Sequence, residues 1–239
     1  MKYYAPKNAS FLLPFQLNSD LLLADLEKCM KFNFLKNYIP ENYDGEDYIL
    51  PLRSIEGRIN RVAAIPCNLE NYKDTVALND CCYFKEVIAS FLCEKETIRL
   101  MNIPPGGVIN THIDYESGYE DGFFRIHIPI ITNNKVHFIL NDQIIIMQSG
   151  EAWYTNVNLP HSVVNNGQTN RVHLVIDCIR NKWSDDLFKS MGYDFDQEKE
   201  VEEVYSKSEA LRIINQLERY DTPENRIFLE QLKSKYDVI

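Results

Sequence analysis

The sequence predicts a mainly β protein with helices at both ends, an α+β architecture, and three observations support this prediction. From about residue 96 to residue 180, apolar residues alternate with polar ones, which is the period-two pattern of half-buried strands. Clusters of Asn, Asp, Gly and Pro interrupt this region about every eight to twelve residues, as in all-β sandwiches and barrels. On either side of it, apolar residues recur every three to four positions, which favours amphipathic helices.

Eight alternating runs are the expected strands of the core, the number that a jelly roll requires. They lie at residues 96–103, 107–114, 123–131, 135–140, 143–148, 151–156, 161–165 and 171–179. Asn133-Asn134 and Asn141-Asp142 suit two-residue hairpin turns, because Asn and Asp tolerate the positive φ that such turns demand.

Two helices are expected before the core. Ser19 is the predicted N-cap of the first, and a second helix should begin near Asn79. The first helix has an apolar face made of Leu22, Leu26, Cys29 and Met30. Between the two helices, residues 40–76 are rich in Pro and Gly and are expected to hold short strands at best.

Two further helices are expected after the core. A capping box of Ser206 and Glu209 predicts one, and Thr222-Pro223 predicts the start of the other. We therefore predict one domain over residues 1–180, with its jelly-roll core at about 96–180, and a helical region over 181–239 that packs on the core or mediates homo-oligomerisation.

Composition excludes several classes of partner. Of the 239 residues, 25 are Lys or Arg and 35 are Asp or Glu, which gives a net charge of −10 and disfavours nucleic acid and anionic membranes. No stretch of apolar residues is long enough for a transmembrane helix. The six cysteines show no CxxC pair, which fits reduced thiols in a cytoplasmic protein.

All five histidines lie between residues 112 and 173, and a metal centre would explain this concentration. His112 and Asp114 are two residues apart, so on a strand both side chains reach one face. A His-x-Asp pair alone is weak evidence, but His161 on a later strand can supply a third ligand. Two histidines and a carboxylate on one face are the ligand set of non-haem Fe(II) oxygenases.

Arg171 follows the turn at residues 165–168 and is the candidate anion clamp. A hairpin at this turn would return Arg171 to a position beside His161, opposite it or one residue off. The planar guanidinium suits a carboxylate. Arg171 could therefore hold the far carboxylate of a 2-oxo acid whose other end chelates the iron, with one iron position left for O2.

Several short motifs in this order resemble the aspartyl/asparaginyl β-hydroxylase family of Fe(II)/2-oxoglutarate dioxygenases, especially the proline cis-4-hydroxylase-like bacterial amino-acid hydroxylases. The motifs are residues 105–109 leading into His112 and Asp114, then 124–129, 150–154, 159–161 and 171–177. The resemblance implies a double-stranded β-helix with iron on His112, Asp114 and His161. It also implies 2-oxoglutarate on Arg171, with help from His127.

Arg125 and His127 share one strand face, so they occupy either a solvated outer face or a ligand-lined interior. With the resemblance the interior is favoured, and Arg125 is then a candidate anchor for the substrate carboxylate, as is Arg99. His173 is expected to be a hydrogen-bonded core residue and His137 to face solvent. The aromatic side chains of Trp153 and Tyr154 are expected to pack in the barrel.

The function that the resemblance implies is hydroxylation of an unactivated C–H bond of a free amino acid or similar small carboxylate, with oxidative decarboxylation of 2-oxoglutarate to succinate and CO2. One alternative is hydroxylation of an Asp, Asn or Pro side chain in a peptide or protein. A metal-dependent isomerase, a cysteine-type dioxygenase and a non-catalytic cupin-like metal-binding or sensor module are further alternatives. A plain cupin has no need of a carboxylate clamp such as Arg171.

Overall fold

The computed structural model describes residues 6–37, 43–44, 47–62 and 68–198, together with Leu211, Ile214, Leu229 and Lys233. The contacts between residues divide the chain into two units. One unit extends to Asp196 and contains all the strands described below, and the second begins at Gln197. The predicted domain boundary at residue 180 stays a prediction.

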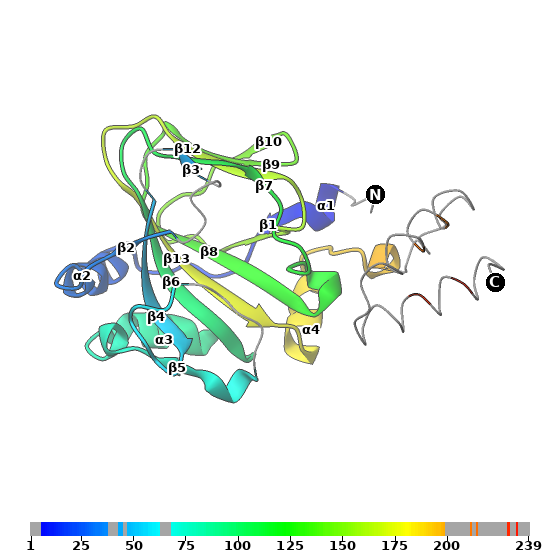
Figure 1. The fold of residues 1–239 in the computed structure, drawn as a ribbon, viewed down its shortest axis with the longest axis horizontal. Helices are drawn as coiled ribbons and strands as arrows, with labels where there is room; N and C mark the ends of the chain where they lie inside the picture. The colour runs from blue at the N-terminus through cyan, green and yellow to red at the C-terminus, as the bar shows by residue number, and fades with distance from the viewer. Residues whose placement is uncertain are drawn as a thin grey trace. The chain divides into compact units, whose positions relative to one another are not determined.

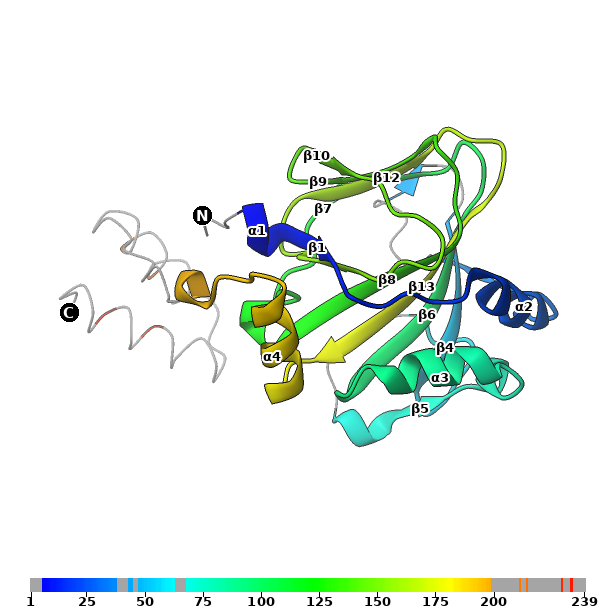
Figure 2. The same ribbon diagram turned by 180° about the vertical axis from the view of Figure 1, so that it is seen from behind.

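The strands form two antiparallel sheets, a larger one and a smaller one (Figures 1 and 2). The larger sheet has the order β1-β11-β8-β13-β6-β4-β2, with β5 beside β4, and the smaller has the order β10-β9-β12-β7-β3. The larger sheet contains β1 (Ser10–Leu12), β2 (Leu35–Lys36), β4 (Tyr48–Ile55), β5 (Tyr72–Asp74), β6 (Lys95–Ile103), β8 (Phe123–Ile131), β11 (Trp153–Thr155) and β13 (Arg171–Ile179). The smaller sheet contains β3 (Tyr43–Asp44), β7 (Val108–His112), β9 (Val136–Leu140), β10 (Gln143–Ile145) and β12 (His161–Asn165).

The predicted fold class, a jelly-roll core with flanking helices, is confirmed. Strands β6 to β13 coincide with the eight predicted runs, with ends that differ by at most three residues. The chain passes between the larger and the smaller sheet at β6–β7, β7–β8, β8–β9, β10–β11, β11–β12 and β12–β13. The two sheets therefore enclose the interior in which the polar residues of the core strands meet.

Helices cover the outer face of the larger sheet (Figure 2). They are α2 (Ser19–Cys29), α3 (Cys82–Ser90) and α4 (Lys182–Ser190), while α1 (Pro6–Ala9) and short 3-10 turns at Leu69–Asn71, Val76–Leu78, Tyr119–Asp121 and Phe195–Glu198 complete the described elements. Leu26, Phe84 and Phe188 from the three longer helices pack in one apolar cluster with Ile126 and Leu174 of the sheet.

Strand parity decides what faces the interior. On β8, Phe124, Ile126 and Ile128 belong to the apolar cluster under the helices, so the alternate residues Arg125 and His127 point the other way. Because helices cover one face and the smaller sheet the other, this polar face is enclosed rather than solvated. Of the two predicted positions for Arg125 and His127, the structure therefore shows the interior one.

One prediction for the N-terminal part was wrong, and the start of one predicted helix differs by three residues. Residues 40–76 contain β4, an eight-residue strand in the interior of the larger sheet. Pro51 lies beside a break in the β4–β6 register, where a missing N–H is tolerated. The second helix begins at Cys82 rather than near Asn79, because a 3-10 turn over Val76–Leu78 precedes it.

The turns were partly predicted. Asn141 and Asp142 have φ of 47° and 63° and join β9 to β10 in register, as a two-residue hairpin requires. Asn133-Asn134 was wrongly predicted as a hairpin, since β8 and β9 belong to different sheets. The same correction applies to residues 165–168, because the chain crosses there from β12 in the smaller sheet to β13 in the larger.

Few residues of the C-terminal tail are described. Leu211, Ile214, Leu229 and Lys233 are helical, as predicted for this region. The predicted caps Ser206 and Thr222 lie outside the described residues. Among the described residues, no helix is long and apolar enough to cross a membrane.

The cap of α2 generates a stability prediction. The side chain of Asn18, not that of Ser19, accepts hydrogen bonds from the backbone N–H groups of Asp20 (3.0 Å) and Leu21 (3.1 Å). We expect Asn18→Ala to lower the free energy of unfolding by about 0.5–2 kcal/mol. Ser19→Ala is the matched control and should cost less than about 0.5 kcal/mol. Urea denaturation measures both, and equal costs would contradict this assignment of the cap.

Candidate metal centre and pocket

The pairing of β7 with β12 brings two histidines together. His112 is the last residue of β7 and His161 the first of β12, and the two are opposite each other in the register, with ring centroids 4.2 Å apart. Asp114 lies two residues past His112, beyond the end of the strand, where its N–H donates to the Val157 carbonyl. One ligand atom from each of these three side chains lies within 4.8 Å of the others.

Backbone carbonyls fix the tautomers of both histidines. Nδ1 of His112 lies 2.8 Å from the Asn110 oxygen, and Nδ1 of His161 lies 3.0 Å from the Leu159 oxygen. A carbonyl oxygen only accepts, so each Nδ1 carries the proton and each Nε2 keeps its lone pair. Burial and the neighbouring His112 lower the pKa of His161 to about 4, so this imidazole is neutral near pH 7.

Asp114 is held as a carboxylate by Arg125. Burial alone would raise the pKa of Asp114, but the Arg125 guanidinium outweighs it and lowers this pKa. Nη1 of Arg125 donates to Oδ2 of Asp114 at 2.5 Å, while Oδ1 lies 3.6 Å from Nε2 of His112. Two imidazole nitrogens and one carboxylate oxygen are therefore directed to a common point, a donor set that fits Fe(II).

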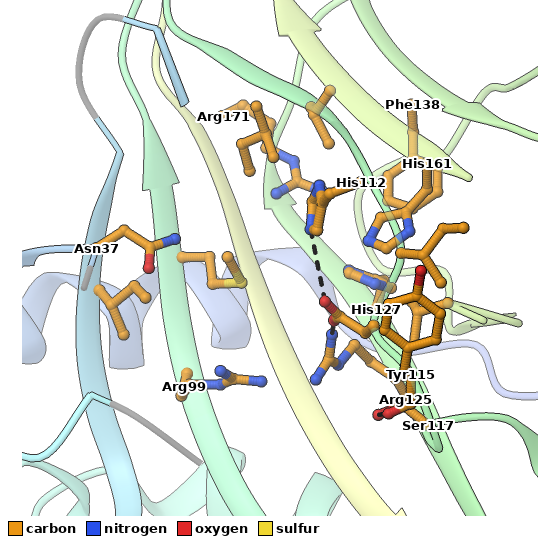
Figure 3. A pocket seen from close by; sticks show the side chains of 17 residues that line it. Asn37, Arg99, His112, Tyr115, Ser117, Arg125, His127, Phe138, His161 and Arg171 are labelled. Carbon is orange, nitrogen blue, oxygen red and sulfur yellow. Dashed lines mark hydrogen bonds and ion pairs between the residues drawn. The ribbon is translucent and has the colours of Figure 1, made fainter. Parts of the chain in front are cut away.

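The three side chains open into a pocket of about 340 Å³ between the sheets (Figure 3). Arg99, Arg125, His127 and Arg171 also line it, so the structure brings every site residue predicted from the sequence to one cavity. The route differs from the expected one, because Arg171 approaches from the opposite sheet rather than from a hairpin with His161.

Arg171 is a buried cation for which the described residues offer no hydrogen-bond acceptor. Its side chain is 1% exposed, and Nε and Nη2 have no acceptor among the described residues. Burial lowers its pKa to about 9, although the nearby carboxylate of Asp47 acts in the opposite direction. A guanidinium in this state is complementary to an anion that enters the pocket.

Two other histidines lie near this guanidinium. His127 and His173 are buried, and neither has a hydrogen-bond partner for either ring nitrogen among the described residues. Burial, followed by the charge of Arg171, lowers the pKa of each well below its usual value, so both rings are neutral. The prediction that His173 is hydrogen-bonded was wrong. His137 is half-buried on β9 rather than fully solvent-facing.

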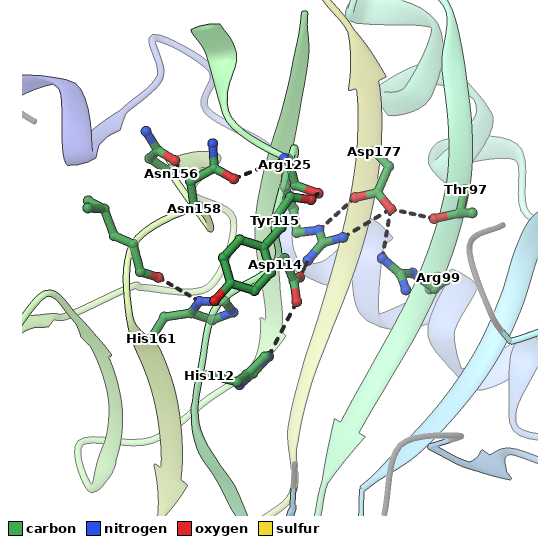
Figure 4. A network of polar contacts seen from close by, with 12 residues as sticks. Thr97, Arg99, His112, Asp114, Tyr115, Arg125, Asn156, Asn158, His161 and Asp177 are labelled. Atoms are coloured by element: carbon green, nitrogen blue, oxygen red, sulfur yellow. Dashed lines mark hydrogen bonds and ion pairs between the residues drawn. The ribbon is translucent and has the colours of Figure 1, made fainter. Parts of the chain in front are cut away.

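The sequence analysis did not identify Asp177, the carboxylate that pairs with Arg99 and Arg125 (Figure 4). Asp177 is 1% exposed and accepts hydrogen bonds from Thr97, Arg99 and Arg125. The signal was present in the sequence, since Asp177 is six residues from Arg171 on the same strand and therefore on the same face. Burial would raise the pKa of Asp177, but Arg125 and Arg99 lower it to about 2.

The sequence profile of the aspartyl/asparaginyl beta-hydroxylase family matches residues 60–181, about half of the chain. An L-proline cis-4-hydroxylase of Rhizobium meliloti (strain 1021) is 33% identical over 79 residues. This match covers 33% of the present chain and 28% of the relative.

Solved structures of similar proteins include an oxidoreductase of the 2OG-Fe(II) oxygenase family from Burkholderia pseudomallei. It is 13% identical with a TM-score of 0.47, and the match covers 72% of this chain and 86% of that one. A prolyl-4-hydroxylase of Pseudomonas putida is 14% identical with a TM-score of 0.45, and the match covers 73% and 94% of the two chains.

The contrast between two buried arginines generates a stability prediction. We expect Arg171→Met to raise the free energy of unfolding of the protein without ligands, by about 1–4 kcal/mol, because it removes a buried charge that has no hydrogen-bonded partner in the described part of the chain. Arg99→Met should lower it by roughly 1–3 kcal/mol, because Arg99 donates to the buried Asp177. Urea denaturation of both variants measures the two signs, and destabilisation by Arg171→Met would show that this guanidinium has a partner in the free protein.

Proposed function

Because the chain belongs to the aspartyl/asparaginyl β-hydroxylase family, we propose that it is an Fe(II)/2-oxoglutarate-dependent dioxygenase that hydroxylates a free amino acid or similar small carboxylate. The observation that carries this proposal is a pocket that combines a His-Asp-His cluster with a buried arginine, Arg171, to which no described residue offers a hydrogen-bond acceptor. The cluster fits a divalent metal and the arginine fits the far carboxylate of a 2-oxo acid.

In this proposal His112, Asp114 and His161 hold Fe(II). The protonated Nδ1 atoms leave the two Nε2 lone pairs for the metal, and ligand atoms of the three side chains lie within 4.8 Å of one another. Bound there, Fe(II) would supply the oxygen chemistry that couples the oxidative decarboxylation of 2-oxoglutarate to succinate and CO2 with hydroxylation of a C–H bond. The protein holds the reactants in place and excludes bulk water.

Arg171 and His127 are the proposed contacts of the far 2-oxoglutarate carboxylate. The guanidinium offers the Nε–Nη2 edge, whose two N–H groups match the two oxygens of a carboxylate. Neutral His127 adds a single N–H donor without a second positive charge. Binding of the dianion would give Arg171 an acceptor that none of the described residues provides.

Arg99 is the proposed anchor for the substrate carboxylate. It lines the pocket, and its Nε has no acceptor among the described residues. The sequence left the choice between Arg125 and Arg99 open, but Nε, Nη1 and Nη2 of Arg125 already donate to Asp177 and Asp114. We therefore assign the anchor to Arg99 and the orientation of Asp114 to Arg125.

A non-catalytic cupin-like metal module is the rival from another class. Such a module would bind a metal at the same three residues but would have no use for a buried guanidinium. A requirement for Arg171 in ligand binding therefore separates the two functions.

The proposed reaction predicts that succinate forms only with Fe(II), 2-oxoglutarate and O2 together. The correct substrate should stimulate its formation and yield about one hydroxylated product per succinate. Succinate release across a panel of free amino acids and small carboxylates, with peptides of Asp, Asn and Pro as a separate arm, measures this. Stimulation by the peptides alone would overturn the substrate class, and no stimulation by any compound would overturn the activity.

The proposed clamp predicts a change in the 2-oxoglutarate requirement. Arg171→Ala should weaken 2-oxoglutarate binding by an amount equivalent to about 2–5 kcal/mol, because the far carboxylate loses a charge-assisted bidentate partner. The affinity for the metal should change little, since Arg171 is not one of the three residues that cluster around the common point. Calorimetric titration with 2-oxoglutarate and Mn(II) under argon measures both, and wild-type affinity for 2-oxoglutarate in the variant would remove Arg171 from the site.

A further inference from the structure

Asp177 is a buried carboxylate to which the proposed reaction assigns no role, and it accepts hydrogen bonds from side chains on two neighbouring strands of the pocket wall. Asp177 on β13 accepts hydrogen bonds at Oδ2 from Thr97 Oγ1 at 2.5 Å and from Arg99 Nη2 at 2.7 Å. Arg125 donates to Asp177 through Nε at 2.7 Å and through Nη2 at 3.3 Å. The cross-strand register places Asp177 directly opposite Arg125, so the backbone itself fixes this pair.

The same guanidinium continues to the metal cluster (Figure 4). With Nε and Nη2 directed to Asp177, Arg125 has only Nη1 directed to Asp114, and it contacts one oxygen, Oδ2. The other oxygen, Oδ1, is left on the side of His112. A chain of three ionic side chains thus runs from the sheet interior to the candidate metal ligand.

We infer that Asp177 is a positioning residue that acts through Arg125 to keep Asp114 available to a divalent cation. The inference rests on the proposed function, since it assumes that His112, Asp114 and His161 bind a metal. It assigns a role to the last residue of the 171–177 motif, which the proposed reaction left without one.

The physical reason is competition between two cations for one carboxylate. A guanidinium can take both oxygens of a carboxylate with two parallel N–H groups, and such a pair would compete with a metal for Asp114. Asp177 occupies the Nε–Nη2 edge of Arg125 and balances its charge, so that only Nη1 donates to Asp114. Arg125 can then hold the Asp114 rotamer with a single hydrogen bond and leave Oδ1 for the metal.

Metal affinity in the absence of 2-oxoglutarate tests this inference. We expect Asp177→Asn to lower the affinity for Co(II), followed by visible absorption under argon, by roughly 10–100-fold. Thr97→Val is the matched control, since it removes another hydrogen bond from the same carboxylate without touching Arg125. This control should lower Co(II) affinity much less than Asp177→Asn does, because Thr97 contacts neither Arg125 nor a proposed metal ligand.

A charge-matched double variant separates positioning from simple charge. Arg99→Gln combined with Asp177→Asn removes one positive and one negative charge, so the net charge of the pocket wall is unchanged. The double variant therefore provides a second folded protein for the test if Asp177→Asn alone is unstable. If Asp177 acts by anchoring Arg125, Co(II) affinity stays low in the double variant. Recovery to the wild-type affinity would show that only charge matters and would overturn the inference.

Variants made in the Arg125→Gln background test whether Asp177 acts through Arg125. Without the guanidinium, Asp177→Asn should cause no further loss of Co(II) affinity, because coupled residues are not additive. Circular dichroism and thermal melting confirm that each variant is folded. Wild-type affinity in folded Asp177→Asn, or additive losses, would overturn the inference alone, whereas failure of the wild-type protein to bind Co(II) would overturn the proposed metal site.

Discussion

The free protein buries a positive charge for which no hydrogen-bond acceptor is present among the described residues, and the arrangement of the pocket depends on that constraint. Arg171 begins β13 in the interior of the larger sheet, and its side chain is 1% exposed. A buried guanidinium in this state is unfavourable unless an anion joins it. The fold therefore maintains a charge whose natural complement is a ligand, which is the usual trade between stability and function at a binding site.

Strand parity turns this constraint into a site. On β13, the residues between the polar positions pack under the helices, so Arg171, His173 and Asp177 share the enclosed face. The neighbouring strand β8 contributes Arg125 and His127 to the same face, opposite Asp177 and Val175 in the register. At one end of this polar face Asp177 balances the charges of Arg99 and Arg125, and at the other end Arg171 is left for an anion. The smaller sheet supplies His112 and His161, which line the same pocket.

The β-core could be predicted from the sequence because alternation and turn residues are local signals. The metal cluster followed from the His-x-Asp spacing and the clustered histidines, and Arg171 followed from its place after the turn at residues 165–168. The resemblance to a family added the role of His127. What could not be predicted was pairing between distant segments. The hairpin expected between His161 and Arg171 does not exist, because in a jelly roll this connection crosses from one sheet to the other. The N-cap of α2 was assigned to Ser19 instead of its neighbour Asn18, because the side chains of both residue types can accept the capping hydrogen bonds and the sequence does not distinguish them.

The role of Arg125 also depends on one feature that the sequence predicts and one that it does not. Its position on the interior face follows from period two, but its partners Asp114 and Asp177 lie 11 and 52 residues away in the sequence. Only the three-dimensional structure shows that its nitrogens already donate hydrogen bonds, whereas Nε of Arg99 has no acceptor among the described residues. Residue type and strand face therefore identified the set of candidate anchors, and the hydrogen bonds chose between them.

The most direct test of the account is anaerobic absorption spectroscopy of the wild-type protein with Fe(II) and 2-oxoglutarate. Chelation of the iron by the 2-oxo acid, with its far carboxylate on Arg171, predicts a weak visible metal-to-ligand charge-transfer band that saturates as 2-oxoglutarate is added. Succinate, which has no 2-oxo group, should give no band. The absence of any band at saturating Fe(II) and 2-oxoglutarate would contradict the claim that this pocket is a 2-oxoglutarate-dependent iron centre.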